Sequence, residues 1–305
     1  MNQGYCALRE SAAWLDLSER GRIRMTGEDR ARLLHAMVSN RIEGLEPGQG
    51  CYAFFLNAQG RILADVNVLA LADAFLLDTE PETRALVYEH LDRHIIADDV
   101  TLEDITAATA EIGIEGPHAT GVLAKMGAPQ PREPYSNERW GERIVLRASS
   151  TGAPGFALFA PLDEKRELIR RIEAAGAVAA GADDARVVRL EMGKPRYGED
   201  FSDKHLPHET QLLHAVNFNK GCYLGQEIVE RVRSRGAVHR FLVRLAIDAK
   251  EPPAPGTKIE AGGKEVGEVM SAAYSPAEGK VLAFAYVREP GAELIVAGAA
   301  ARQIR

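Results

Sequence analysis

The chain contains the stretch Lys220-Gly-Cys-Tyr-Leu-Gly-Gln-Glu227, which holds one of its three cysteines between two glycines. From Gln226 to Arg233 the apolar residues are spaced to lie on one face of a helix, with charged residues on the rest. The two glycines predict a tight turn that leads into this helix. Cys222 is therefore expected just before a helix N-terminus, where backbone N–H groups and the neighbouring Lys220 favour a thiolate.

The position of Cys222 alone favours a simpler interpretation, because most free cysteines are small buried side chains. The stretch from Lys220 to Glu227 nevertheless resembles the signature Lys-Gly-Cys-Tyr-x-Gly-Gln-Glu of the YgfZ family of folate-binding proteins. That family is related to the T-protein, the aminomethyltransferase of the glycine cleavage system. The resemblance implies that Cys222 is a reactive or ligating thiol and that Lys220 stabilises its thiolate.

The composition is that of an ordinary globular protein, with 305 residues of which 46% are hydrophobic and 27% charged. The net charge of −7 argues against a protein that coats nucleic acid non-specifically, although a local basic patch stays open. Neither a secretory signal nor an apolar run of membrane-spanning length is apparent. The cysteines are far apart and form no Cys-x-x-Cys pair, so no metal site is expected. We expect a cytoplasmic protein in a reducing compartment.

A hairpin is predicted from two strands at 51–56 and 61–71 around the turn Asn57-Ala-Gln-Gly60. Alternation along the second strand puts Asp65 on one face with two leucines, where an acid is most simply a sheet-edge or solvent-facing residue. The hairpin also resembles that of YgfZ-like proteins. In T-proteins it carries two adjacent aspartates, one of them implicated in catalysis. Here Ala64 precedes Asp65, so only the second acid is kept, and Asp65 is the candidate catalytic acid.

The segment from Arg189 to Asp200 resembles the Arg-x-Glu-x-Gly…Tyr-Gly-x-Asp segment of T-proteins and their relatives, which lines the folate pocket. The resemblance implies that Glu191 contacts the pterin ring, since a carboxylate can accept paired hydrogen bonds from an amino-pyrimidinone edge. Tyr197 would supply a flat apolar wall. Without the resemblance, Glu191 is a helix-surface acid and Tyr197 packs a turn. The cofactor implied is tetrahydrofolate or a one-carbon derivative.

A run of arginines between Arg231 and Arg240 would suit phosphate groups or the glutamate tail of a folate. The simpler interpretation is a solvated helix face whose arginines pair with Glu227 and Glu230. We keep Arg231 and Arg240 as candidate folate contacts.

Short strands separated by turns after Gly236 predict a small antiparallel barrel, and strands alternating with helices before it predict an α+β unit. The expected fold class is therefore α+β. The resemblance implies a T-protein-like three-lobed architecture with ferredoxin-like α+β lobes and a C-terminal antiparallel β-barrel. We divide the chain into an aminomethyltransferase-like folate-binding domain, 1–236, and a barrel domain, 237–305. A further lobe at about 46–115 would be inserted into the first domain.

Three functions stay open. The first, which the YgfZ resemblance implies, is a tetrahydrofolate-binding protein that supports iron–sulfur cluster assembly or repair. One cysteine cannot hold a cluster alone, so contacts with iron–sulfur proteins or assembly factors would be transient. The second is an aminomethyltransferase of the glycine cleavage type, with Asp65 polarising the folate amine. Two features argue against it: Ala64 replaces the first of the two adjacent aspartates, and the Cys222 motif is present. The third is a non-catalytic scaffold or tRNA-binding module. Whether the chain is an enzyme is left open.

Overall fold

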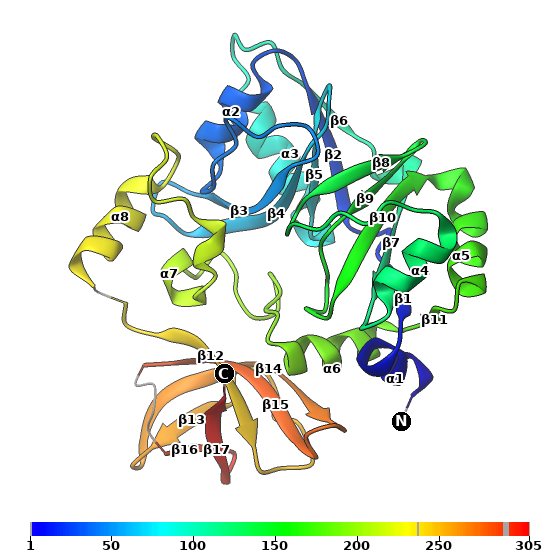
Figure 1. The fold of residues 1–305 in the computed structure, drawn as a ribbon. Helices are drawn as coiled ribbons and strands as arrows, with labels where there is room; N and C mark the ends of the chain where they lie inside the picture. The colour runs from blue at the N-terminus through cyan, green and yellow to red at the C-terminus, as the bar shows by residue number, and fades with distance from the viewer. Residues whose placement is uncertain (1, 237, 289–292, 305) are drawn as a thin grey trace.

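The computed structural model describes residues 2–236, 238–288 and 293–304. Its strands form a five-stranded sheet, a six-stranded sheet and a closed barrel, which make up three lobes (Figure 1). The α+β fold class and the C-terminal antiparallel barrel predicted from the sequence are both confirmed. In the described part of the chain, no helix combines the length and the apolar character needed to cross a bilayer.

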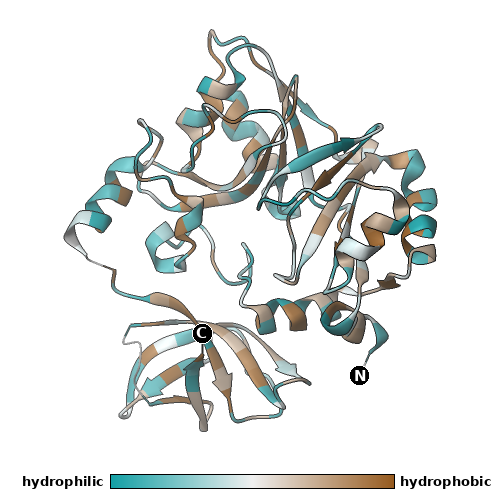
Figure 2. Ribbon diagram, in the orientation of Figure 1, coloured by the Kyte–Doolittle hydropathy of each residue, from teal (hydrophilic) through white to brown (hydrophobic). Residues whose placement is uncertain are grey.

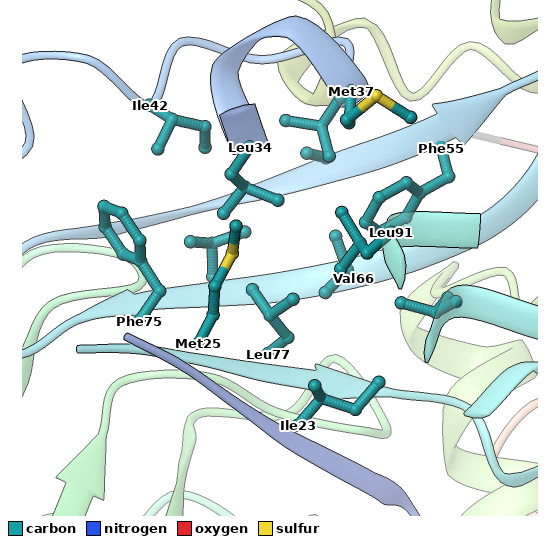
Figure 3. Close-up of a cluster of buried hydrophobic side chains, with 14 of the residues drawn as sticks. Ile23, Met25, Leu34, Met37, Ile42, Phe55, Val66, Phe75, Leu77 and Leu91 are labelled. Atoms are coloured by element: carbon teal, nitrogen blue, oxygen red, sulfur yellow. The ribbon is translucent and has the colours of Figure 1, made fainter. Parts of the chain in front are cut away.

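The first lobe is an antiparallel sheet with the strand order β3-β4-β5-β2-β6. Its strands are β2 (Gly21–Thr26), β3 (Gly50–Leu56), β4 (Ile62–Ala70), β5 (Phe75–Thr79) and β6 (Thr101–Asp104). Helices α2 (Arg30–Met37) and α3 (Arg84–Asp92) bury apolar side chains against one face of the sheet (Figure 3). The predicted lobe at 46–115 corresponds to this sheet only in part, because β2 joins it from outside that range.

The second lobe is a six-stranded sheet with the order β11-β1-β7-β10-β9-β8. Its strands are β1 (Ala13–Asp16), β7 (Thr109–Glu115), β8 (Asn137–Trp140), β9 (Arg143–Leu146), β10 (Gly155–Pro161) and β11 (Val178–Ala179). Helices α4 (Ala119–Met126) and α5 (Lys165–Ala174) pack on it through a shared apolar core. Leu69 and Leu76 of the first lobe meet Phe159 of this one in a smaller apolar cluster, so the two sheets pack against each other.

The third lobe is the barrel, closed in the order β12-β15-β14-β13-β16-β17. Its strands are β12 (Phe241–Ile247), β13 (Lys258–Ala261), β14 (Lys264–Ser275), β15 (Lys280–Val287), β16 (Leu294–Val296) and β17 (Ala299–Ile304). Closure pairs the two edges that an open sheet would expose. Five of these strands follow from the sequence pattern, whereas β17 does not.

The remaining helices link the lobes. They are α1 (Gln3–Glu10), α6 (Ala182–Met192), α7 (Pro207–Thr210) and α8 (Gln226–Arg235), together with short 3₁₀ helices at Pro81–Thr83, Thr106–Ala108, Leu162–Glu164 and Leu213–Ala215. Helix α6 lies between the second lobe and the barrel (Figure 1). Its Leu190 packs against Leu242 and Phe284 on the outside of the barrel. Figure 2 shows that α8 is largely hydrophilic, whereas the sheets are largely apolar. The predicted helix start at Gln226 is correct.

Candidate functional site

A cavity of about 570 Å³ lies where the two sheets meet the region of helix α6. Its walls come from the β1–β2 connection, from β4 and β7, from the end of β5 and from the chain around and after α6. The polar residues that line it include Arg20, Tyr52, Asp65, Asp78, Glu80, Arg186, Arg189, Lys194, Arg196 and Glu199. About half of all the residues that line the cavity are charged and the others include apolar side chains, so the cavity suits a ligand that has both polar and apolar parts.

Asp65 is the predicted site residue that the structure places in this cavity. It lies in the middle of β4, opposite Phe54 of β3, and its side chain is buried. The hydroxyl of Tyr52 donates to Asp65 Oδ2 at 2.7 Å, whereas Oδ1 is buried and has no hydrogen-bond partner among the described residues. The expectation of a solvent-facing acid is therefore wrong. A buried carboxylate oxygen without a donor is a strong indication of a ligand site, because such atoms are costly to leave unpaired.

Burial raises the pKa of Asp65 to about 6, and the negative charge of Glu80 adds to this. The hydroxyl of Tyr52 and the positive charges of Arg20 and Lys194 act in the opposite direction. A carboxyl group poised near neutral pH can both hold and release a proton at that pH.

Glu80 is held as an anion beside Asp65 by two arginines. Arg20 donates to Glu80 Oε1 at 2.5 Å, and Arg196 donates to Glu80 Oε2 at 2.8 Å. Burial works against the charged form of Glu80, but these guanidinium groups outweigh it, so the pKa of Glu80 lies below its ordinary value. Arg20 also donates to Asp78 at 2.7 Å. The positive charge of each arginine is therefore already paired.

Lys194 is the first residue after Gly193, the glycine that ends α6. Its ammonium lies 5.3 Å from the centre of the Tyr52 ring, a cation–π distance. Burial lowers the pKa of Lys194, Arg20 adds to this, and Asp65 opposes it. The backbone of Lys194 is fixed, because its N–H donates to Arg189 O at 3.0 Å and its carbonyl accepts from Arg189 Nη1 at 3.0 Å.

The structure gives the Lys220 side chain a different role from the one expected. Lys220 Nζ donates to three carbonyl oxygens at the end of α2, those of His35, Val38 and Asn40, at 2.5, 2.7 and 2.8 Å. An ammonium has three N–H groups, so none is left for Cys222. The Cys222 side chain is exposed and does not line the cavity. In this arrangement Lys220 therefore does not stabilise a Cys222 thiolate, in contrast to the prediction from the sequence.

Glu191 and Tyr197 also lie outside the cavity lining. The Glu191 carboxylate accepts from Tyr5 Oη at 2.8 Å and from Ser275 Oγ at 2.5 Å, and Arg9 Nε is 3.3 Å away. It thus joins α1, α6 and the barrel. Tyr197 is buried and packs edge-on against Phe201. The expectation of a surface acid is wrong for Glu191, and the pterin contacts of both residues stay predictions.

Arg231 and Arg240 are both paired within the protein. Arg231 donates to Glu227 at 2.5 Å, one helical turn earlier, which is the simpler interpretation given above. Arg240 donates to Glu209 at 2.9 Å and lies 5.0 Å from the centre of the Tyr286 ring. Neither lines the cavity, so the structure brings only Asp65 of the predicted residues into it.

The sequence interpretation did not identify Tyr52, Glu80 or Lys194 as site residues. Tyr52 could have been found once the register is known, because it pairs with Asn67, two residues along β4 from Asp65, and so lies diagonally across from Asp65 on the same face of the sheet. Glu80 follows β5 of the first lobe, whereas Lys194 follows the linking helix α6, and no local pattern connects them. Within the described ranges, no group of three or more His, Cys, Asp or Glu side chains is arranged to hold a metal ion.

Two domain models describe most of this chain. The model of the GCVT N-terminal domain matches residues 1–220, and that of the glycine cleavage T-protein C-terminal barrel domain matches residues 240–302. A solved structure, the glycine cleavage system aminomethyltransferase T from Bartonella henselae, superposes with a TM-score of 0.90. It covers 99% of this chain and 87% of its own at 22% identity, which shows the fold alone.

Among similar proteins, an aminomethyltransferase of Streptomyces coelicolor is 31% identical over 93% of this chain and 80% of its own length. An aminomethyltransferase of Rubrobacter xylanophilus is 30% identical, with coverage of 95% and 80%. A putative chloroplastic transferase of Arabidopsis thaliana is 29% identical over 84% of this chain, which spans only 61% of that protein. The domain matches and these relatives show that the chain belongs to the glycine cleavage T-protein, or aminomethyltransferase, family.

Proposed function

We propose that this protein binds tetrahydrofolate in the cavity at Asp65 and catalyses the transfer of an aminomethyl-derived one-carbon unit to it. The observation that carries the proposal is the buried Asp65, which lines the cavity and whose Oδ1 has no donor among the described residues. The residues present fit a tetrahydropterin: Asp65 can accept from a ring N–H, Lys194 can donate to a carbonyl oxygen, and the cavity of about 570 Å³ has the size of a small-molecule site.

Bound tetrahydrofolate supplies a nucleophilic amine that accepts the one-carbon unit. In this proposal Asp65 would accept a hydrogen bond from that amine and take its proton as the new bond to carbon forms and the bond between that carbon and the donor group breaks; the aminomethyl nitrogen would leave as ammonia when the methylene bridge closes. Tyr52 fixes the orientation of the Asp65 carboxylate through the 2.7 Å bond to Oδ2, which leaves Oδ1 for the amine. A pKa of about 6 keeps Asp65 ionised at pH 7 and still basic enough to accept a proton.

The domain division belongs to the same proposal. The folate-binding part is 1–236 and the barrel 237–305, which the end of α8 at Arg235 and the start of β12 at Phe241 support. In this division the barrel contributes contacts that hold α6, such as the one between Ser275 and Glu191. Residue 237 itself lies outside the described residues.

The test compares the wild type with Asp65→Asn and with Asp73→Asn, an exposed control acid that pairs with Arg24. Tetrahydrofolate binding is measured by calorimetry, and turnover as formation of 5,10-methylenetetrahydrofolate from an aminomethyl donor. We expect Asp65→Asn to bind within a few-fold of wild type and to lose about 100-fold or more in turnover. Asp73→Asn should match the wild type. Absence of folate binding by the wild type, or full turnover by Asp65→Asn, would overturn the proposal.

A second candidate function is support of iron–sulfur cluster assembly or repair, as the YgfZ resemblance implies. One observation favours it: Cys222 is exposed, whereas Cys6 and Cys51 are partly buried. Burial also raises the pKa of Cys51 to about 12, which leaves it inert. If this function holds, Cys222→Ser retains folate binding but fails to restore iron–sulfur enzyme activities in cells that lack the protein, while Cys51→Ser restores them. Equal restoration by the two variants contradicts it.

A further inference from the structure

Among the described residues, one cation that lines the cavity has no anionic partner. Of the lining cations, Arg20 and Arg196 pair with Glu80, while Arg186 and Arg189 pair with Glu199. Lys194 lies within 4.0 Å of no carboxylate oxygen in the part of the chain that the structure describes. A largely buried ammonium is costly to leave unpaired, because burial disfavours the charged form. Lys194 therefore requires an explanation.

The fold fixes the position of this ammonium. Helix α6 ends at Gly193, whose φ of +73° turns the chain sharply, and a Cβ there would come within 2.8 Å of the Arg244 side chain. The two backbone bonds to Arg189 then pin Lys194, and Pro195 restricts the next residue. The Tyr52 ring positions the ammonium at 5.3 Å, and the hydroxyl of the same ring holds Asp65. Tyr52 thus contacts both groups.

Asp65 is faced by charged or titratable groups from several elements. They are Tyr52 of β3, Glu80 after β5, Arg20 before β2, Lys194 after α6, and the more distant hydroxyls of Tyr135 and Tyr197. The three tyrosines are neutral at physiological pH, since burial raises the pKa of Tyr135 and of Tyr197 to about 12 and that of Tyr52 well above its ordinary value. The charge of Arg20 is shared between Asp78 and Glu80. Lys194 is therefore the cation near Asp65 that no carboxylate of the described residues pairs, and its charge favours the ionised form of Asp65.

We propose that Lys194 is a positioning residue for Asp65: held over the Tyr52 ring, it keeps the neighbouring carboxylate ionised in the ligand-free cavity, ready to accept an N–H. The two groups together favour a ligand that presents an N–H donor close to a carbonyl or carboxylate oxygen. The use of Asp65 in turnover rests on the proposed function. The electrostatic relation between Lys194 and Asp65 does not, and it can be measured without any ligand.

The test is a pH titration of ligand-free protein that carries ¹³C at the aspartate side-chain carboxyls, followed by NMR. The Asp65 signal is the one missing from Asp65→Asn. We expect Lys194→Met to raise the titration midpoint of Asp65 by about 1 pH unit, because an opposite charge nearby has been removed. Lys194→Arg should restore the wild-type midpoint. The control is Lys258→Met on the barrel surface, which removes an exposed lysine that pairs with Glu265 and should change nothing.

An unchanged midpoint in folded Lys194→Met overturns the inference, as does an equal rise in Lys194→Arg. In turnover, the acid limb of the pH profile of Lys194→Met should move upward by the same amount as the NMR midpoint. The outcomes separate the two proposals. If the midpoint moves but Asp65→Asn keeps full turnover, the proposed function fails and the Lys194 inference stands. If Asp65→Asn loses turnover and the titration midpoint of Asp65 is unchanged in Lys194→Met, only the Lys194 inference fails.

Discussion

The buried charge of Asp65 destabilises the folded protein, and the same burial brings the pKa of this carboxyl group close to neutral pH. Its pKa is raised from 3.8 to about 6 because its charge is buried, so the unfolded chain releases this proton at a lower pH than the folded protein does. Between about pH 3.8 and pH 6 the folded state binds more protons, and the contribution of Asp65 to stability falls as the pH rises. Above this window the cost is fully present.

Asp65→Asn should therefore stabilise the protein at pH 7 by about 2 kcal/mol, since the amide can still accept from Tyr52 and carries no buried charge. At pH 4 the gain should largely disappear, because Asp65 is protonated in the folded wild type. Urea unfolding at the two pH values measures both differences, with Asp73→Asn as the surface control. A variant that is less stable than wild type at pH 7 would show that the buried charge of Asp65 does not destabilise the folded protein.

Single residues also show where the sequence pattern is insufficient. The resemblance to a folate-binding family draws attention to Asp65, and the structure places this acid in the cavity. The same resemblance pairs Lys220 with Cys222, two residues along the chain. In the folded protein the lysine reaches the carbonyls that end α2, a common role for a cation at a helix C-terminus. Side-chain direction within a turn depends on what packs against it, which local sequence does not record.

At the scale of elements, packing explains Gly225 of the 220–227 stretch, whereas a Cβ added at Gly221 would meet no described atom within 4 Å. Helix α8 begins directly beside the turn of the β3–β4 hairpin. Gly225 has a φ of +83°, and a Cβ there would lie 2.6 Å from Asn57 O and 3.2 Å from the Cα of Gly60. The close approach of two backbones requires glycine. The hairpin that carries Asp65 is thus held in place by the start of α8.

Gly225→Ala should destabilise the protein by about 2 kcal/mol or more. Alanine is strained at the positive φ of this position, and its Cβ would clash with the hairpin backbone. The matched control is Gly236→Ala at the other end of α8. Gly236 has a φ of +63°, and a Cβ added there would meet no described atom within 4 Å, so only the backbone strain applies. That strain should cost about 1 kcal/mol. Denaturant unfolding measures both variants. Equal losses for the two would mean that the hairpin contact contributes nothing.

The hairpin and the start of α8 were predictable because each has a local signal: alternation around Asn57–Gly60, and helical spacing after Gln226. Strand β17 has none. Its sequence, Ala299–Ile304, is alanine-rich and partly exposed, and it becomes a strand by pairing with β12 and β16. Barrel closure is a non-local requirement, so the sixth strand could be inferred only once the other five are known to form a barrel.

At the scale of the whole molecule, the three lobes meet around α6. The cavity combines Tyr52 and Asp65 of the first lobe with Lys194 after α6, and the barrel holds α6 from the other side. Asp200 and Arg189 form a buried ion pair, and Ser271 of the barrel donates to the same aspartate. The site is therefore a product of lobe assembly. This is why sequence patterns predicted the lobes but recovered only one residue of the cavity.

Glu191 provides a test of that assembly. Glu191→Ala leaves the hydroxyls of Tyr5 and Ser275 without their acceptor, and we expect a loss of about 2 to 3 kcal/mol in urea unfolding. Ser275→Ala removes one of these donors from the barrel side and should cost about 1 kcal/mol. If Glu191 only joins the lobes, tetrahydrofolate binding falls with stability in both variants and recovers in Glu191→Gln, which keeps an acceptor oxygen. If Glu191 also contacts the pterin, Glu191→Gln loses folate binding while its unfolding free energy stays close to that of the wild type.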